Sequence, residues 1–267
     1  MPLKLFICPD GVTRPIEQCL DNCPRQEGRC LTLPTLHEIS YGREWRGKPS
    51  TTQLLNPTRL EYLKIIKNYA IVPQERAYAL LGTQHHRRLE LMAKKIDELK
   101  AEKKLSDEIN TGMLDLLEPD GDKWILTDYK TWGNFAVTKI LTPNSHERLH
   151  NSLQLNDYRL KVETLGFAIS KMRWQITVRD GGTWIAKKNG VDGKIILIDA
   201  DWLEDDYVTT YFYDKSKVLL NALESNTMPE LCDYEGRWGG RRCKGSYCDV
   251  HQFCPEGAMV NKVALEV

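Results

Sequence analysis

Residues 108–130 read EINTGMLDLLEPDGDKWILTDYK, and this stretch decides the predicted fold. Segments 108–117 and 123–130 have the composition of β-strands, and the EPDGD between them supplies the Pro, Asp and Gly of a turn. We therefore predict a β-hairpin. Side chains two residues apart on a strand point to the same face, so Asp128 and Lys130 are expected to project together from the second strand.

The segments around the hairpin have mostly helical periodicity. Upstream, we predict a helix in TRLEYLKIIKNYA, after the capping pair Asn56-Pro57, and two more in QERAYALLG and HHRRLELMAKKIDELKAEKKL. Downstream, we predict a helix over 145–167, strand-like segments in AISKMRWQITVRD, WIAKK and GKIILIDAD, and a last helix over 205–223. This order indicates an α/β (α+β) fold, with a mixed central sheet flanked by helices.

The composition is typical of a soluble globular protein, with 41% hydrophobic and 28% charged residues in a chain of 267. The 37 basic and 37 acidic residues balance, which removes the simplest argument for nucleic-acid binding, a globally basic chain. Basic segments remain in HHRRLELMAKK and among the C-terminal cysteines, and phosphate attraction is local. No apolar run approaches the roughly 20 residues that span a bilayer, so we expect a cytoplasmic protein without membrane contact.

Eight cysteines form two groups of four, separated by a long stretch without any. The first group is Cys8, Cys19, Cys23 and Cys30, and the second is Cys232, Cys243, Cys248 and Cys254. Disulfides are not expected in a reducing compartment, and grouped thiolates indicate metal sites. The expected organisation is a Cys-rich N-terminal segment with a linker over 1–56, a central domain over 57–230, and a Cys-rich C-terminal segment over 231–267.

The hairpin carries residues suited to phosphodiester hydrolysis. Asp115 on the first strand and Asp128 on the second can hold Mg²⁺ or Mn²⁺, which prefer carboxylate oxygens. Lys130 can reach the same phosphate or the attacking water. An Asp-x-Lys tripeptide alone is not specific, because a surface ion pair would look the same. Pro119-Asp120 is a rival first ligand, but it lies in the predicted turn, far from Asp128.

Four short motifs follow one another around these residues: GTQHHRRLE at 82–90, GMLD at 112–115, DYKT at 128–131 and QLNDY at 154–158. The ordered set resembles the RecB-like branch of the PD-(D/E)XK nucleases, and the resemblance covers roughly residues 80–260. That branch includes the RecB and AddB nuclease domains, CRISPR-adaptation nucleases and phage exonucleases. The resemblance implies a restriction-endonuclease-like core and a metal-dependent deoxyribonuclease.

The family's functional residues are carried over by motif position. The implied metal ligands are His86, Asp115, Asp128 and the peptide carbonyl of Tyr129. Lys130 matches the catalytic lysine, although Asp128 stands where many members carry Glu. Gln154 and Tyr158, one helical turn apart, match the motif that contacts DNA and supports the active site. His85 fits the spacing less well than His86 and is left as a DNA contact or a helix-surface residue.

The cysteines extend the resemblance. Related nucleases carry a 4Fe–4S cluster on C-terminal cysteines spaced C-x2-C-x5-C, commonly with one ligand from the N-terminal side; here the first spacing is x4. We expect this cluster on Cys232, Cys243, Cys248 and Cys254, and a zinc ion on Cys8, Cys19, Cys23 and Cys30. Zinc at both groups is the alternative, because thiolates suit both metals.

The sequence therefore predicts a Mg²⁺- or Mn²⁺-dependent DNA nuclease, expected to be an exonuclease in phage or host recombination, repair or CRISPR-like adaptation. Its expected partner is DNA, and protein partners in such complexes stay unspecified. The alternative is a zinc-stapled nucleic-acid-binding protein without catalysis, which would use the basic segments as its contact surface. The intact set of Asp115, Asp128 and Lys130 favours the nuclease, since a binding module does not need it.

Overall fold

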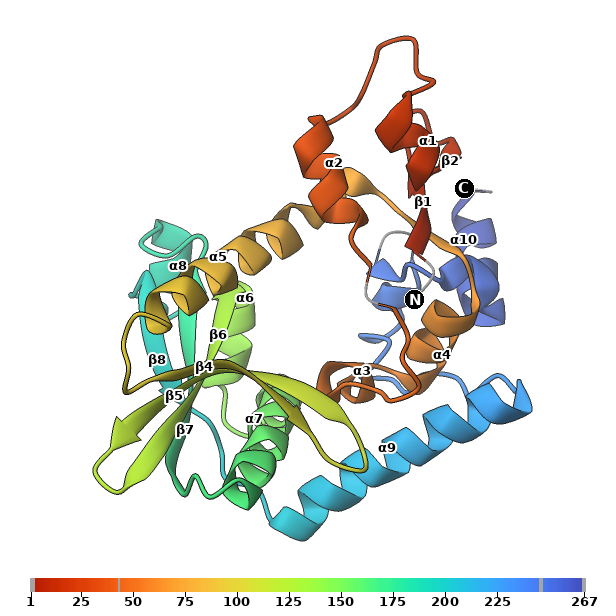
Figure 1. Ribbon diagram of the computed structural model, residues 1–267. Coiled ribbons are helices and arrows are strands. Elements are labelled where there is room, and N and C mark those ends of the chain that lie inside the picture. The colour runs from red at the N-terminus through yellow and green to blue at the C-terminus, as the bar shows by residue number, and fades with distance from the viewer. Residues whose placement is uncertain (1–2, 43, 245–246, 266–267) are drawn as a thin grey trace. The chain divides into compact units, whose positions relative to one another are not determined.

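The computed structural model in Figure 1 describes residues 3–42, 44–244 and 247–265. The chain divides into two units. The first consists of Met1–Gly47, Asn56–Leu80 and Lys215–Val267, and the second of Lys48–Leu55 and Leu81–Asp214. Helices α5 (Ala77–Ala93) and α9 (Asp205–Ser225) each run from one unit into the other.

The second unit is built on a five-stranded sheet in the order β4-β5-β6-β7-β8. Its strands are β4 (Lys100–Ser106), β5 (Thr111–Asp120), β6 (Lys123–Trp132), β7 (Ile169–Val178) and β8 (Ile195–Asp199). The β6–β7 pair is parallel and the others are antiparallel. Parallel neighbours need a crossover, and helices α6 (Asn134–Leu141) and α7 (His146–Thr164) supply it. The predicted mixed sheet flanked by helices is confirmed.

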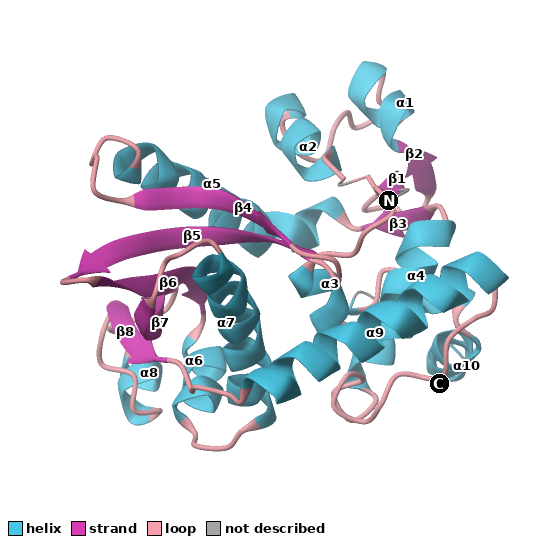
Figure 2. Ribbon diagram, turned by 60° about the horizontal axis from the view of Figure 1, so that its bottom comes forward, coloured by secondary structure: helices cyan, strands magenta, loops and turns pink. Residues whose placement is uncertain are grey.

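Two helices cover opposite faces of this sheet, as Figure 2 shows. Helix α7 packs on the larger core, where Leu155 meets strand residues such as Leu126 and Trp174, all fully buried. The other face carries a smaller cluster, in which Ala93 of α5 packs with Tyr129. Side chains of β6 therefore contribute to the cores on both faces of the sheet.

A short segment from earlier in the chain completes the second unit. Helix α3 (Thr51–Leu55) follows a parallel bridge between Ser50 and Thr111, next to the start of β5. The Thr51 hydroxyl donates to Asp157 Oδ2 at 2.6 Å, and Asp157 is buried on α7. This hydrogen bond joins residues 106 positions apart in the sequence.

The first unit contains a three-stranded sheet, in which β1 (Leu3–Ile7) pairs antiparallel with β2 (Thr13–Pro15) and parallel with β3 (Tyr69–Ile71). Besides parts of α5 and α9, its described residues form α1 (Ile16–Asp21), α2 (Leu33–Ser40), α4 (Thr58–Ile66), α10 (Pro255–Leu265) and the 3-10 turns η1 (Pro73–Arg76), η2 (Arg241–Cys243) and η4 (His251–Phe253). Phe6, Leu36, Tyr62 and Leu63 are buried in this unit.

Three element predictions were wrong. The predicted helix of residues 85–105 ends at Ala93, and its last part is strand β4, because pairing with β5 overrides the helix propensity of Lys, Glu and Ala. Residues 184–188, predicted as a strand, form helix α8 (Trp184–Lys188), which Thr183 caps by accepting the Ala186 N–H. Residues 69–70, predicted as the end of a helix, belong to strand β3 (Tyr69–Ile71).

The hairpin turn is shorter than the predicted EPDGD. Strand β5 continues to Asp120, which pairs with Lys123, so only Gly121 and Asp122 form the turn. Gly121 has a φ of 66°, the left-handed conformation that glycine adopts without a steric cost. Throughout the described part of the chain, no helix combines the length and the apolar character needed to cross a membrane.

Candidate active site

Strands β5 and β6 separate at the two predicted acidic ligands. Their pairing runs from the turn to Leu116 opposite Thr127, and the next position places Asp115 opposite Asp128. At this position the Tyr129 N–H donates to Oδ2 of the Asp115 side chain at 2.7 Å, where a regular ladder would use a backbone carbonyl of the neighbouring strand. The residues Asp115 and Asp128 are 9% and 3% exposed. Two buried carboxylates thus lie where the strands diverge, a region called the strand fork below.

The rival ligand Asp120 lies at the other end of the same strand. It is exposed, pairs with Lys123 beside the turn, and accepts a hydrogen bond from the Ser170 hydroxyl at 2.6 Å. Four residues of β5 separate it from Asp115, so it takes no part in the strand fork.

Gln154 on α7 joins the predicted residues of β6. Lys130 Nζ lies 2.8 Å from Asp128 Oδ2 and donates to Gln154 Oε1 at 3.0 Å. The Gln154 amide in turn donates to Asp128 Oδ1 at 3.3 Å and to the Tyr158 hydroxyl at 3.2 Å. The four residues that the motifs single out on β6 and α7 are therefore connected through one amide side chain.

Helix α5 brings His86 to the strand fork from the other face of the sheet. His86 Nδ1 lies 3.3 Å from Asp115 Oδ1, and its ring meets Tyr129 edge to face with centroids 6.0 Å apart. Burial disfavours the charged imidazole, but the hydrogen bond and charge of Asp115 outweigh it, so the pKa of His86 is raised. His85 instead lies 3.3 Å from the Thr177 hydroxyl, and burial lowers its pKa.

The charges at the strand fork suit a bound cation. Burial raises the pKa of Asp128 above its ordinary value and the charge of Asp115 raises it further, while Lys130 opposes both. The charges of Lys130 and His86 therefore do not fully offset the burial of Asp128 beside Asp115. Carboxylates and an imidazole are ligands of Mg²⁺ and Mn²⁺, so the residues present fit such an ion.

The strand fork also contains Glu102, which the sequence reasoning missed. Strands β4 and β5 are paired along their length except at one position, where Glu102 stands opposite Asp115. Glu102 has a φ of 48°, in the left-handed region that is uncommon for any residue except glycine. Ligand atoms of Glu102, Asp115 and His86 lie within 4.8 Å of one another. No motif marks Glu102, so only the strand pairing could have identified it.

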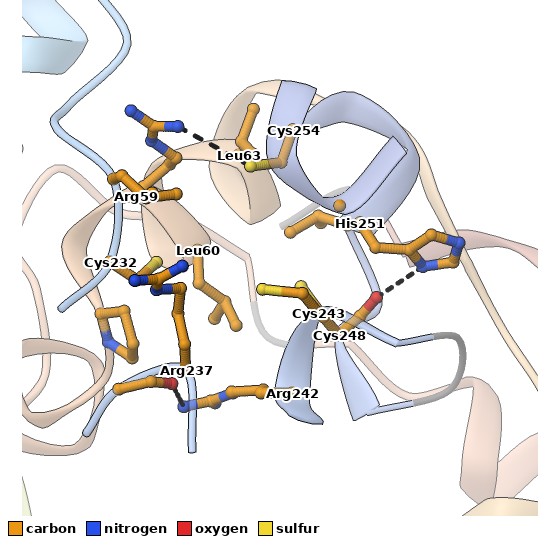
Figure 3. A pocket seen from close by; sticks show the side chains of 15 residues that line it. Arg59, Leu60, Leu63, Cys232, Arg237, Arg242, Cys243, Cys248, His251 and Cys254 are labelled. Carbon is orange, nitrogen blue, oxygen red and sulfur yellow. Dashed lines mark hydrogen bonds between the residues drawn. The ribbon is translucent and has the colours of Figure 1, made fainter. Parts of the chain in front are cut away.

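The C-terminal cysteines line one pocket in the first unit, shown in Figure 3. Arg59, Arg237 and Arg242 line the same pocket, and Arg59 Nη1 donates to Cys254 Sγ at 3.7 Å. Burial raises the pKa of Cys232, Cys243 and Cys248, and neighbouring thiols raise the pKa of each further. Four thiols and three arginines fit an anionic thiolate-ligated centre, whose charge the guanidinium groups would balance.

The N-terminal cysteines lie in the first unit, at the end of β1, in α1 and in the loop that follows. Cys8 follows β1 and Cys19 lies in α1, and both are buried, whereas Cys23 and Cys30 lie in the following loop and are half-buried. Burial raises the pKa of Cys19, and the charges of the other three thiols add to this effect. Among the described residues, no three cysteine sulfurs lie within 4.8 Å of one another in either group.

The histidines His146 and His150 on α7 have no third metal ligand beside them among the described residues. His146 and His150 stack with centroids 5.7 Å apart on α7, and His150 Nε2 lies 2.8 Å from the carbonyl oxygen of Leu55. His150 therefore joins α7 to the end of α3.

Comparisons with known proteins assign no activity to the chain. No protein-family model matches the sequence, and no curated protein matches it. A solved structure titled "Crystal structure of SSO0001" aligns with a TM-score of 0.49 and 16% sequence identity, covering 84% of this chain and 94% of that one.

Proposed function

We propose that the second unit has a PD-(D/E)XK core and that the protein is a Mg²⁺- or Mn²⁺-dependent DNA nuclease. One observation carries the proposal: Asp115, Asp128, Lys130 and His86 meet at the strand fork, although they come from three separate elements. A hydrophobic core has no use for two buried carboxylates beside a lysine and a histidine, since each charged group costs free energy to bury. The expected exonuclease action belongs to the same proposal.

The roles of the residues follow from their positions. His86, Asp115, Asp128 and the Tyr129 carbonyl would hold the cation, which would polarise the scissile phosphate and offset its charge. Lys130, held by Asp128 and Gln154, points its ammonium group where it can orient the attacking water and stabilise charge on the phosphate oxygens. Gln154 fixes both side chains of β6 in one orientation, and Tyr158 fixes Gln154.

The cysteine groups belong to the same proposal as structural centres. The pocket of Figure 3 would hold a 4Fe–4S cluster on Cys232, Cys243, Cys248 and Cys254, and the N-terminal group would hold zinc. The basic residues between the C-terminal cysteines would contact the DNA backbone, where attraction to phosphate is independent of sequence.

Lys130→Ala and Asp115→Ala should each lower Mn²⁺-dependent cleavage of end-labelled linear DNA at least about 100-fold, because the first removes the cation beside the phosphate and the second removes a ligand of the metal. Products released from an end as single nucleotides would identify an exonuclease. Lys123→Ala and Asp122→Ala remove the same charges at the exposed hairpin turn and should cleave at the wild-type rate.

Circular dichroism of the four variants checks that each is folded. Full activity of both active-site variants would contradict the assignment of the site. A wild-type protein that binds DNA but never cleaves it, with either metal, would favour the alternative of a non-catalytic binding protein.

Freshly purified protein should be brown, with the broad visible absorbance of thiolate-ligated iron. Cys248→Ser should remove the colour, because it deletes a ligand of the cluster, whereas Cys23→Ser should keep it and release zinc instead. A colourless wild-type protein with two zinc ions per chain would contradict the cluster without affecting the nuclease proposal.

A further inference from the structure

We infer that Glu102 is a metal ligand, and that Glu102, His86 and Asp115 together form a subsite for one divalent cation at the strand fork. The motif residues alone do not include this glutamate, which reaches the site from β4. The inference rests on the proposed nuclease function, which explains what the cation would do. The binding of the cation can be measured without DNA.

The geometry of the three ligand atoms is the first observation. They come from α5, β4 and β5, and all lie within 4.8 Å of one another. In the residues that the structure describes, no other three His, Cys or acidic ligand atoms are grouped as closely. Donors on three separate elements that converge to this extent are close enough to share one cation.

The isolation of the Glu102 carboxylate is the second observation. It forms no hydrogen bond or ion pair with any described residue, and it interacts electrostatically with the carboxylates of Asp115 and Glu90 and, in the opposite sense, with His86 and Lys94. Its backbone is in the left-handed region, which a side chain with a Cβ adopts at a cost in free energy. No hydrogen bond or ion pair with a described residue offsets the burial and the backbone strain of Glu102, and a cation between Glu102 and Asp115 would offset both.

Asp128 provides a third, independent observation on the neighbouring strand. It is 3% exposed, and its Oδ2 accepts no hydrogen bond of good geometry, although the Lys130 ammonium lies 2.8 Å away. It interacts electrostatically with both Asp115 and His86. The buried carboxylate, which interacts with two of the three proposed ligands, thus keeps an oxygen without a well-formed hydrogen bond.

The donor set indicates which cation is preferred. One imidazole nitrogen with two carboxylates is a softer set than the all-oxygen surroundings that Mg²⁺ favours. We therefore expect Mn²⁺ to bind this subsite more tightly than Mg²⁺, and Glu102 to contribute to the affinity for both.

Titration calorimetry with MnCl₂ tests the inference on the full-length protein, dialysed against buffer free of divalent cations so that thiolate-bound metal stays in place. Glu102→Gln keeps the shape of the side chain and removes its charge, and it should weaken Mn²⁺ binding at least about tenfold. Glu98→Gln removes the same charge from an exposed position shortly before β4 and should bind Mn²⁺ like the wild type.

The variant Glu102→Gly distinguishes a role of Glu102 in metal binding from a role in the stability of the fold. Glycine adopts the left-handed backbone without strain, so this variant should melt at the same or a higher temperature than the wild type without Mn²⁺. The rise in melting temperature that Mn²⁺ causes in the wild type should be much smaller in Glu102→Gly.

The outcomes distinguish this inference from the proposed function. Wild-type Mn²⁺ affinity in Glu102→Gln, or a lower melting temperature of metal-free Glu102→Gly, would overturn the inference even if the wild type cleaves DNA. Weakened Mn²⁺ binding in both variants, combined with a wild type that never cleaves DNA, would support the cation subsite while the nuclease proposal fails.

Discussion

Gln154 is the residue on which the orientation of the β6 side chains depends, since its amide contacts Asp128, Lys130 and Tyr158. Gln154→Leu should lower the single-turnover rate of DNA cleavage about 10- to 100-fold, as expected when a group that orients a ligand is lost. Tyr158→Phe removes only the hydroxyl behind Gln154 and should lower the rate less than about tenfold. Rates measured at saturating Mn²⁺ check this order, and a larger loss in Tyr158→Phe would contradict it.

At this scale, the sequence predicts the residues that regular spacing brings together. Asp128 and Lys130 are two apart on a strand, and Gln154 and Tyr158 are four apart on a helix, so their shared faces follow from periodicity. Glu102 could not be found in this way. Its place depends on a left-handed backbone and on the alignment of β4 with β5, and neither is encoded in a local pattern.

Among the elements, β6 and α7 were predicted because they are long and their periodicity is clear, and the Ser145 cap of α7 accepts the Arg148 N–H at 3.0 Å. Strand β4 was not predicted, because its lysines and alanine also suit a helix, and only the adjacent strand decides between the two. It is an edge strand of the sheet, where lysine side chains are common and reach solvent.

The contact between β5 and α7 leads to a prediction at Gly112. A Cβ there would lie 2.5 Å from Cε1 of the buried Tyr158 ring and 3.2 Å from Oγ1 of Thr51. Gly112→Ala should therefore lower the free energy of unfolding by about 1–3 kcal/mol and reduce DNA cleavage by displacing the ring. Urea unfolding measures the first effect. Met113→Ala truncates the exposed neighbour and should change stability little; equal stability of both variants would show that the ring moves freely.

Over the whole molecule, each unit combines segments that are far apart in the sequence. The first sheet joins Leu3–Ile7 to Tyr69–Ile71 by parallel pairing, and parallel strands have no turn between them that a sequence pattern could reveal. The sequence instead predicts three consecutive segments, from the positions of the cysteines, the helix start at Asn56-Pro57 and the order of the motifs. Within the first unit, Asp249 connects the C-terminal cysteine segment to α4 and η1 through Lys64 at 2.9 Å and Arg76 at 2.6 Å.

Asp249→Asn should lower the free energy of unfolding by about 1.5–3 kcal/mol at pH 7, because it breaks two charged hydrogen bonds.

Burial alone would raise the pKa of Asp249, but Lys64 and Arg76 outweigh it and hold the pKa below its usual value. The stabilisation is therefore complete well above the unfolded-state pKa of about 3.9 and is lost as the pH falls through the lower folded value. Urea unfolding from pH 7 downward checks this, with Glu224→Gln as an exposed control. A difference between Asp249→Asn and wild type that persists unchanged in acid would contradict it.

The hydrogen bond from the Tyr129 amide to Asp115 makes this one backbone proton a sensor of the strand fork. Its nuclear magnetic resonance frequency depends on the charge and orientation of the carboxylate that accepts it. Any ion that binds Asp115 redistributes that charge, so the Tyr129 signal of ¹⁵N-labelled protein should move during a titration with a diamagnetic ion such as Mg²⁺. Occupancy of the site can then be followed in solution in the absence of nucleic acid and of turnover.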